Sequence, residues 1–171
     1  MSFTRKEYHE EAPRKSLTPA VAKIKIAAYC AYQERCQKEV RDKLYEYGLH
    51  SYEVENLVTA MILEGFVNEE RFARAFVRGK FRMKKWGRVR IIKELKFRVD
   101  SDNLVRAALK EIDEQEYWDT LVYLAEKKVG EMKEKDSFKR KMKLYQFLIY
   151  KGYESDLVQQ AIDGLMEQGI S

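Results

Sequence analysis

The sequence predicts an all-α fold, in which three tandem three-helix repeat units form an elongated, curved body. Three observations support this expectation. No segment alternates polar and apolar residues over the length of a strand. With two prolines and eight glycines, the chain is also poor in the turn residues that an all-β protein needs. Finally, one apolar pattern recurs about every fifty residues, which is typical of tandem helical repeats.

The recurring pattern is a trio of apolar residues at positions i, i+4 and i+8, the spacing of one helix face. The trios are Val54, Val58 and Ile62; Leu104, Ala108 and Ile112; and Leu157, Ala161 and Leu165. Nine or ten residues before each trio, an apolar pair spaced by four ends in leucine. These pairs are Val40 and Leu44, Ile91 and Leu95, and Leu144 and Leu148. Each repeat therefore contains a helix, a short turn and another helix.

The first helix is predicted to begin at Pro19 and to run to about Gln33. Thr18 can cap its free amides, and proline is favoured at the first helical position. We expect its buried face to consist of Val21, Ile24, Ala28 and Ala31. Residues 1–17 carry mixed charge without apolar periodicity, so we interpret them as a mobile N-terminal arm.

Glycines mark two of the turns inside the repeats. Gly48 and Gly152 each follow a helix, where a residue that tolerates positive φ ends the helix at low cost. The aligned position in the middle repeat is Val99, so we expect a different turn there. The caps expected for the helices that follow are Ser51, Ser155 and either Asp100 or Ser101.

The middle repeat is predicted to open with a helix capped by Asn68, which displays Phe72, Ala75 and Phe76. Its counterpart in the third repeat is the segment 118–130. The resulting units span residues 18–65, 66–113 and 114–171.

Few residues suit catalysis or metal binding. His9 and His50 lie in different settings, and Cys30 and Cys36 have neither zinc-site nor disulfide-framework spacing, so we expect reduced, partly buried thiols. No phosphate-binding, dinucleotide-binding or metalloprotease motif occurs. We therefore expect neither an enzyme nor a metal or cofactor. No apolar run approaches about twenty residues and no signal peptide is evident, so we expect a cytoplasmic protein without a membrane span.

The functional signal is a basic segment, residues 78–98. It carries ten basic residues and one acidic residue, so it contributes +9 and the rest of the chain −4 to the net charge of +5. The basic residues are Arg78, Lys80, Arg82, Lys84, Lys85, Arg88, Arg90, Lys93, Lys96 and Arg98. Such local excess indicates a binding surface, because a merely soluble face usually mixes both signs.

Within this segment a helix is predicted to begin near Gly87. We expect Val89, Ile92 and Leu95 to face the core, which leaves most of the cations on the more exposed sides. Trp86 has two interpretations, a core residue or an aromatic anchor for a partner. The charge alone fits two partners, nucleic acid phosphates or an acidic groove on another protein.

Residues 66–98, FVNEERFARAFVRGKFRMKKWGRVRIIKELKFR, combine an aromatic–apolar–Asn start, an acid before Arg-Phe-Ala, a basic helix, and a glycine before Arg-x-Arg and Glu-Leu. This combination resembles the central signature of the RecX family, regulators of the bacterial RecA recombinase. The turn KLYEYGL, 43–49, and the segment LIYKGYESDLVQQAI, 148–162, are similar to the family's first and third repeats. Two departures are Glu69, where Asp is usual, and the missing glycine at Val99.

The resemblance implies three tandem three-helix units that bind in the helical groove of the RecA filament on single-stranded DNA. It also implies inhibition of strand exchange, ATP hydrolysis and the co-protease activity of the SOS response, and binding to single- and double-stranded DNA through phosphates. Eight cations are expected to line the groove-facing side: Arg78, Lys80, Arg82, Lys84, Lys85, Arg88, Arg90 and Lys93. Trp86, Lys96 and Arg98 complete the candidate site.

Two other functions remain open. The chain could be a free-standing nucleic-acid-binding protein, although residues 88–96 lack the Asn, Gln or Ser with which recognition helices read bases. It could also be a helical-repeat adaptor for another acidic protein. We expect a monomer, because no heptad seam is long enough to force self-association.

Overall fold

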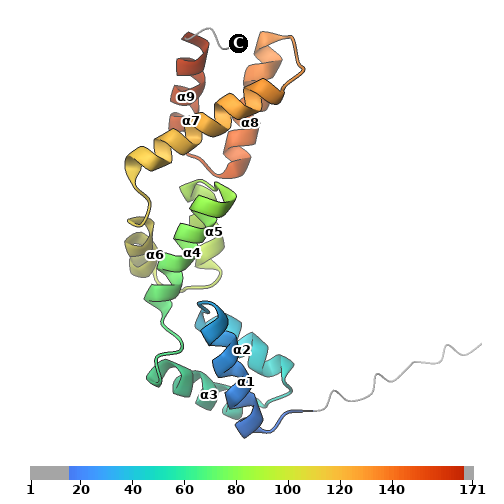
Figure 1. The fold of residues 1–171 in the computed structure, drawn as a ribbon, viewed down its shortest axis with the longest axis vertical. Helices are drawn as coiled ribbons and strands as arrows, with labels where there is room; N and C mark the ends of the chain where they lie inside the picture. Colours follow the sequence, from blue (N-terminus) through green and yellow to red (C-terminus); the bar gives the residue numbers. More distant parts are fainter. Residues whose placement is uncertain (1–15, 168–171) are drawn as a thin grey trace, which may run out of the picture.

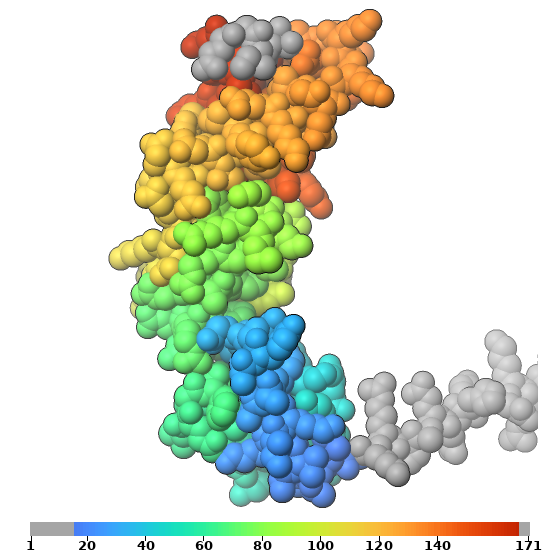
Figure 2. Space-filling view, viewed as in Figure 1, coloured from blue at the N-terminus to red at the C-terminus, as the bar shows by residue number. Residues whose placement is uncertain are grey.

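The computed structural model describes residues 16–167 and confirms the all-α repeat fold. Its helices pack in three successive groups of three along an elongated, bowed body (Figures 1 and 2). Unit 1 contains α1 (Pro19–Tyr32), α2 (Gln37–Glu46) and α3 (Ser51–Leu63). Unit 2 contains α4 (Glu69–Lys84), α5 (Arg88–Lys96) and α6 (Asp102–Leu109). Unit 3 contains α7 (Glu114–Glu131), α8 (Ser137–Lys151) and α9 (Ser155–Glu167).

The predicted helix ends are partly confirmed. The side chains of Thr18, Asn68 and Ser101 accept hydrogen bonds from the first turns of α1, α4 and α6. Ser51 and Ser155 are instead the first residues of α3 and α9, so their predicted capping role is wrong. His50 precedes α3, and its backbone amide donates to the Glu53 carboxylate at 2.9 Å.

The turns after α2, α5 and α8 differ as expected. Gly48 and Gly152 have φ of +82° and +96°, the left-handed conformation that favours glycine. In the middle repeat, the backbone amide of Val99 donates to the Leu95 carbonyl at 2.9 Å, and no residue of that turn has positive φ. The Val99 side chain is buried there, so the turn gains an apolar core residue in place of a glycine.

The predicted buried face of α1 is wrong. The helix buries Ala22, Ile26 and Cys30, whereas Val21 and Ile24 are exposed. Ala28 and Ala31 are exposed as well. The error arises because α1 is apolar nearly all round, so periodicity alone offers two candidate faces. A similar shift occurs in α5, where Ile91 and Leu95 are buried and Val89 is 54% exposed.

The buried apolar side chains form two cores. One lies inside unit 1, among α1, α2 and α3, and extends to Val67 just before α4. The other is continuous through units 2 and 3 and includes Cys36 from the α1–α2 connection. Units 2 and 3 are therefore joined by shared hydrophobic burial, which makes them a single packed body.

The junction between units 2 and 3 is a helix-to-helix joint. The backbone amide of Gly87, the N-cap of α5, donates to the carbonyl of Lys151 at 2.9 Å, and the amide of Val89 in the first turn of α5 donates to the carbonyl of Gly152 at 3.0 Å. Each helix end satisfies backbone groups that the other leaves free, and the positive end of α5 meets the negative end of α8. A Cβ on Gly87 would lie 2.2 Å from the Gly152 oxygen, so this contact requires glycine.

The junction between units 1 and 2 is mostly polar. Arg71 of α4 pairs with Glu34 at 2.6 Å, and the backbone amide of Gln37 donates to Glu69 at 3.1 Å. Arg98 lies 3.9 Å from Glu39. Because exposed ion pairs contribute only about 0–1 kcal/mol each, this joint is weaker than the one formed by the shared core.

Replacing Gly152 with alanine is expected to destabilise the fold. Its φ is positive, and a Cβ there would lie 2.3 Å from the Arg90 Cβ. Left-handed strain and overpacking together should lower the free energy of unfolding by roughly 2–4 kcal/mol in urea denaturation. The matched control is Gly164→Ala in α9, where a Cβ meets nothing within 4 Å. That change should be neutral or stabilising by up to about 1 kcal/mol, and an equal loss in both variants would contradict the joint.

The buried thiols should be inert at neutral pH. Burial raises the pKa of both Cys30 and Cys36 to about 11, from the usual 9.0. Alkylation by iodoacetamide at pH 8 should therefore be far slower in the folded than in the unfolded chain. Because the thiol pKa values are higher in the folded than in the unfolded state, the two neutral thiols contribute to the free energy of unfolding. This contribution is fully present below about pH 9 and is lost as the pH rises towards 11. A Cys30→Ala, Cys36→Ala variant should lose that part of the pH dependence, and an unchanged profile would disprove the assignment.

Candidate binding surface on unit 2

The positive charge of the described chain is concentrated in unit 2. Residues 68–112 contain fourteen basic and six acidic residues, a net charge of +8. Residues 19–64 carry six basic and seven acidic residues, and residues 113–167 carry nine and twelve, so both flanking units are slightly negative. A field of one sign over the middle of a long body is the electrostatic signature of a binding surface.

Five of the ten predicted cations pair with carboxylates of the chain itself. The pairs are Arg78–Glu111 at 2.8 Å, Arg82–Glu116 at 3.7 Å, Arg88–Glu114 at 2.8 Å, Lys96–Asp102 at 2.9 Å and Arg98–Glu94 at 3.3 Å. Among the described residues, the other five have no carboxylate within 4.0 Å: Lys80, Lys84, Lys85, Arg90 and Lys93. We call these five the unpaired cations. The ten residues thus contribute unequally to the field that a partner meets.

Helix α4 separates the two kinds of cation. An α-helix turns about 100° per residue, so Arg78 and Arg82 share one side while Lys80 lies about 200° round from Arg78. The first side faces Glu111, which follows α6, and Glu116 of α7. The second side faces Phe76 and Trp86. Four of the eight cations expected on the groove-facing side belong to α4, and they are therefore divided between two sides of this helix.

A row of alternating cations and aromatic rings crosses the second side. Arg98 and Lys80 each lie 5.2 Å from the centre of the Phe76 ring, and Lys80 lies 5.0 Å from Trp86. Arg90 then lies 4.1 Å from Trp86 and 5.0 Å from Tyr150 of unit 3. We call these six residues the cation–aromatic ladder: Arg98, Phe76, Lys80, Trp86, Arg90 and Tyr150.

The aromatic rings of the ladder position cations without cancelling their charge. An aromatic ring attracts a cation through its quadrupole, so it restrains the side chain but carries no net charge. Lys80 and Arg90 are held in this way and keep their full charge. Ion pairing, in contrast, neutralises Arg78 and Arg82 on the opposite side of α4.

The core interpretation of Trp86 is confirmed in part, and its role as an aromatic anchor for a partner stays a prediction. Its side chain is partly buried and packs against the core of units 2 and 3, while two cations lie over its ring. The preceding residue, Lys85, has φ of +55°, the only positive φ of a non-glycine residue in the described chain. This left-handed cap ends α4 and lets the backbone turn at Trp86 before Gly87 reaches α8.

Arg88 is mostly buried and packs against Tyr117 of unit 3. Its side chain is 18% exposed, and its guanidinium lies 4.0 Å from the centre of the Tyr117 ring. The Tyr117 hydroxyl accepts a hydrogen bond from the Arg88 amide at 2.9 Å and donates one to Glu154 at 2.6 Å. Burial raises the pKa of Tyr117 far above its usual value, so the hydroxyl stays protonated and can keep donating.

Sequence reasoning missed several residues of this surface. Tyr150 is 72% exposed at the end of α8 and lies beside Arg90 through the joint between units 2 and 3. Phe76 was expected as a residue of α4 but not as part of the site. The aromatic spacing of Phe76, Trp86 and Tyr150 has no periodic signal, because three different elements bring them together.

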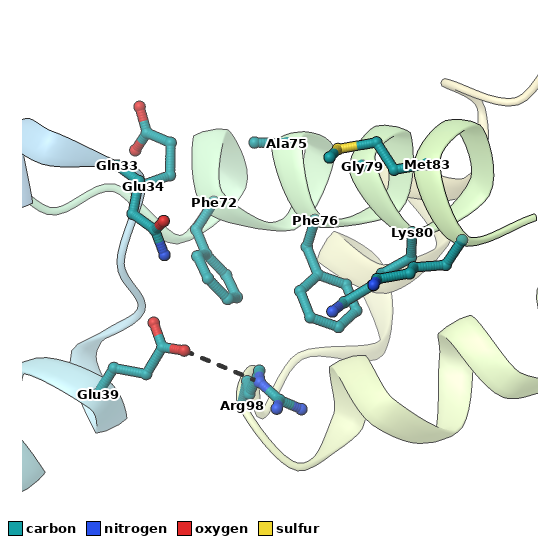
Figure 3. A pocket seen from close by; sticks show the side chains of 11 residues that line it. Gln33, Glu34, Glu39, Phe72, Ala75, Phe76, Gly79, Lys80, Met83 and Arg98 are labelled. Carbon is teal, nitrogen blue, oxygen red and sulfur yellow. Dashed lines mark ion pairs between the residues drawn. The ribbon is translucent and has the colours of Figure 1, made fainter. Parts of the chain in front are cut away.

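A groove opens between units 1 and 2 at one end of the ladder (Figure 3). Its volume is about 380 Å³. The α4 side contributes Phe72, Ala75, Phe76, Gly79, Lys80, Met83 and Lys84, and Arg98 follows α5. Gln33, Glu34 and Glu39 of unit 1 form the facing wall. We call this feature the inter-unit groove.

Two further findings concern chemistry and membranes. Among residues 16–167, no group of three or more His, Cys, Asp or Glu side chains could hold a metal ion. In the same range, none of the helices has the length and hydropathy needed to cross a bilayer.

Comparison with known proteins identifies the repeat units. Residues 68–109 match the family model described as "RecX, second three-helix domain", and residues 114–162 match "RecX, third three-helix domain". A "Regulatory protein RecX" of Clostridium perfringens is 33% identical over 71% of this chain, and one of Bacillus mycoides is 22% identical over 94%. The chain spans 58% and 57% of the lengths of these relatives, less than two thirds.

Solved structures share the fold. A crystal structure of RecX from Lactobacillus salivarius superposes with a TM-score of 0.74 at 24% identity, covering 86% of this chain and 96% of that one. A second RecX structure gives a TM-score of 0.76 at 21% identity, covering 85% and 71%. The family models, the curated relatives and the shared fold together lead to one conclusion: this chain belongs to the RecX family of regulatory proteins.

Proposed function

We propose that this chain regulates a bacterial RecA recombinase, mainly as an inhibitor, by binding in the groove of the RecA–DNA filament. In this role it modulates recombination, DNA repair and the co-protease activity of the SOS response. The binding surface is the cation–aromatic ladder together with the unpaired cations. Membership of the RecX family supports the regulatory role, and the surface supports the kind of partner.

The observation that carries the proposal is the set of unneutralised cations on units 2 and 3. These two units share one hydrophobic core, which supports both ends of the ladder. A filament groove offers both acidic protein surface and DNA phosphates along its length, and many weak contacts add up there. Each exposed charge pair contributes only about 0–1 kcal/mol, so affinity depends on several acting together.

Nucleic acid binding alone is the second candidate. Arg90 between two aromatic rings is typical of single-strand binding surfaces, where bases stack beside a charged groove. Titration against bare DNA, free recombinase and assembled filament separates the candidates. Preference for the filament supports the first, and equal affinity for bare DNA supports the second. An adaptor for another acidic protein would bind none of the three.

Reversing three unpaired cations should abolish inhibition. The variant Lys80→Glu, Lys84→Glu, Lys93→Glu changes six units of charge on exposed or partly exposed side chains. We expect at least about a tenfold loss in the inhibition of filament ATP hydrolysis, with an unchanged melting temperature. The matched control is Lys127→Glu, Lys133→Glu, Lys135→Glu in unit 3, which should inhibit normally. Full inhibition by the first variant would refute the assignment.

Paired and unpaired cations of α4 should behave differently. Arg78→Gln removes a cation that Glu111 already neutralises, whereas Lys80→Gln removes one that faces a partner. We expect Arg78→Gln to change inhibition by less than about twofold and to cost at most about 1 kcal/mol of stability. Lys80→Gln should weaken inhibition severalfold, at a cost in stability of about 1 kcal/mol from the lost cation–π contacts. The reverse order would show that the partner binds the other side of α4.

A further inference from the structure

We infer that the inter-unit groove is a docking site for an acidic segment of a partner protein, which inserts one large apolar side chain between units 1 and 2. The inference rests on the proposed function, since it names the chemistry of the segment by which a protein partner is held. Nothing in the family resemblance assigned a role to this groove.

The wall formed by α4 is apolar. The rings of Phe72 and Phe76 lie 5.8 Å apart and project from α4 toward Arg98 (Figure 3). Ala75 extends this wall, and Met83 is 82% exposed beside it. An exposed, flexible thioether next to aromatic rings adapts to the shape of an apolar guest.

Gly79 keeps this wall open. It lies inside α4, where glycine is about 1 kcal/mol less favourable than alanine. Its φ is not positive, and a Cβ added there would meet nothing within 4 Å. No contact within the chain therefore requires glycine at this position. What the missing side chain provides is room in the groove for an atom of another molecule.

The charges on the groove favour an acidic guest. Lys80 and Lys84 lie on its rim and belong to the unpaired cations. Both acids of the facing wall lie beside an arginine: Glu34 pairs through Oε1 with Arg71 at 2.6 Å, while its Oε2 is buried without a hydrogen-bond partner, and Glu39 lies 3.9 Å from Arg98. The unbalanced charge is therefore positive. Carboxylates that flank an apolar side chain would meet the two lysines while that side chain fills the space beside Gly79.

The surroundings of Phe76 favour a peptide over a nucleobase. Lys80 and Arg98 both lie over the Phe76 ring, so a base could stack flat on it only by displacing one of them. A branched or aromatic side chain that contacts Ala75, Met83 and the ring edge needs no such displacement. The groove thus differs from the other end of the ladder, where Tyr150 offers an exposed ring.

The test uses a short fluorescein-labelled peptide in which glutamates flank one phenylalanine, with fluorescence anisotropy as the readout. Gly79→Leu should fill the groove and weaken peptide binding at least about tenfold, while the better helix former keeps or raises the melting temperature. The matched control is Gly130→Leu on α7, where an added Cβ also meets nothing within 4 Å. It should bind the peptide as the parent protein does. Peptides with Phe→Ser or Glu→Gln changes should bind more weakly.

Three results of the peptide assay would overturn the inference. These are no binding of the peptide by the parent protein, equal binding by Gly79→Leu, or a loss of oligothymidylate rather than peptide affinity in Gly79→Leu. The filament assay separates this failure from that of the proposed function. Suppose that the charge reversal at Lys80, Lys84 and Lys93 abolishes inhibition but Gly79→Leu does not. The proposed binding surface is then supported, and the docking site in the inter-unit groove is refuted. If Gly79→Leu loses both peptide binding and inhibition, the groove is the docking site.

Discussion

The contact between the start of α5 and the end of α8 is the constraint on which the candidate binding surface depends. Two backbone hydrogen bonds join these helix ends, and the close approach of Gly87 and Gly152 makes them possible. The contact brings Arg90 of unit 2 against Tyr150 of unit 3 and closes the core that both units share. Tyr150 is the residue of the ladder that this contact contributes from unit 3.

Two kinds of interaction sort the positive charge of unit 2. Carboxylates from residues 94–116 neutralise five of the ten cations in residues 78–98 and thereby stabilise the packing of α4, α5 and α6. Aromatic rings restrain others without neutralising them. A basic face that only contacts solvent would need neither the ion pairs nor the cation–π contacts. The combination accounts for a surface that is both well positioned and strongly positive, and the inter-unit groove adds an apolar contact at one end of it.

Much of the architecture could be predicted from the sequence, because the repeat spacing and the turn glycines are local signals. The buried face of α1 could not be predicted from the sequence, because apolar residues surround this helix. Only its packing against α2 and α3 decides which of them are buried. The division of the cations was also beyond local reasoning. Glu111 reaches Arg78 from 33 residues away, and Tyr150 reaches Arg90 from 60 residues away. Such pairs depend on the tertiary fold, which a count of charges along the chain does not contain.

The central claim is that the side of α4 carrying Lys80 and Lys84, and not the side carrying Arg78 and Arg82, contacts the recombinase filament. Site-specific photo-cross-linking tests this most directly, with a benzophenone side chain placed at position 84 or at position 82 of the full chain. The account predicts efficient cross-links to the filament from position 84 and few from position 82. Stronger cross-linking from position 82 would contradict it.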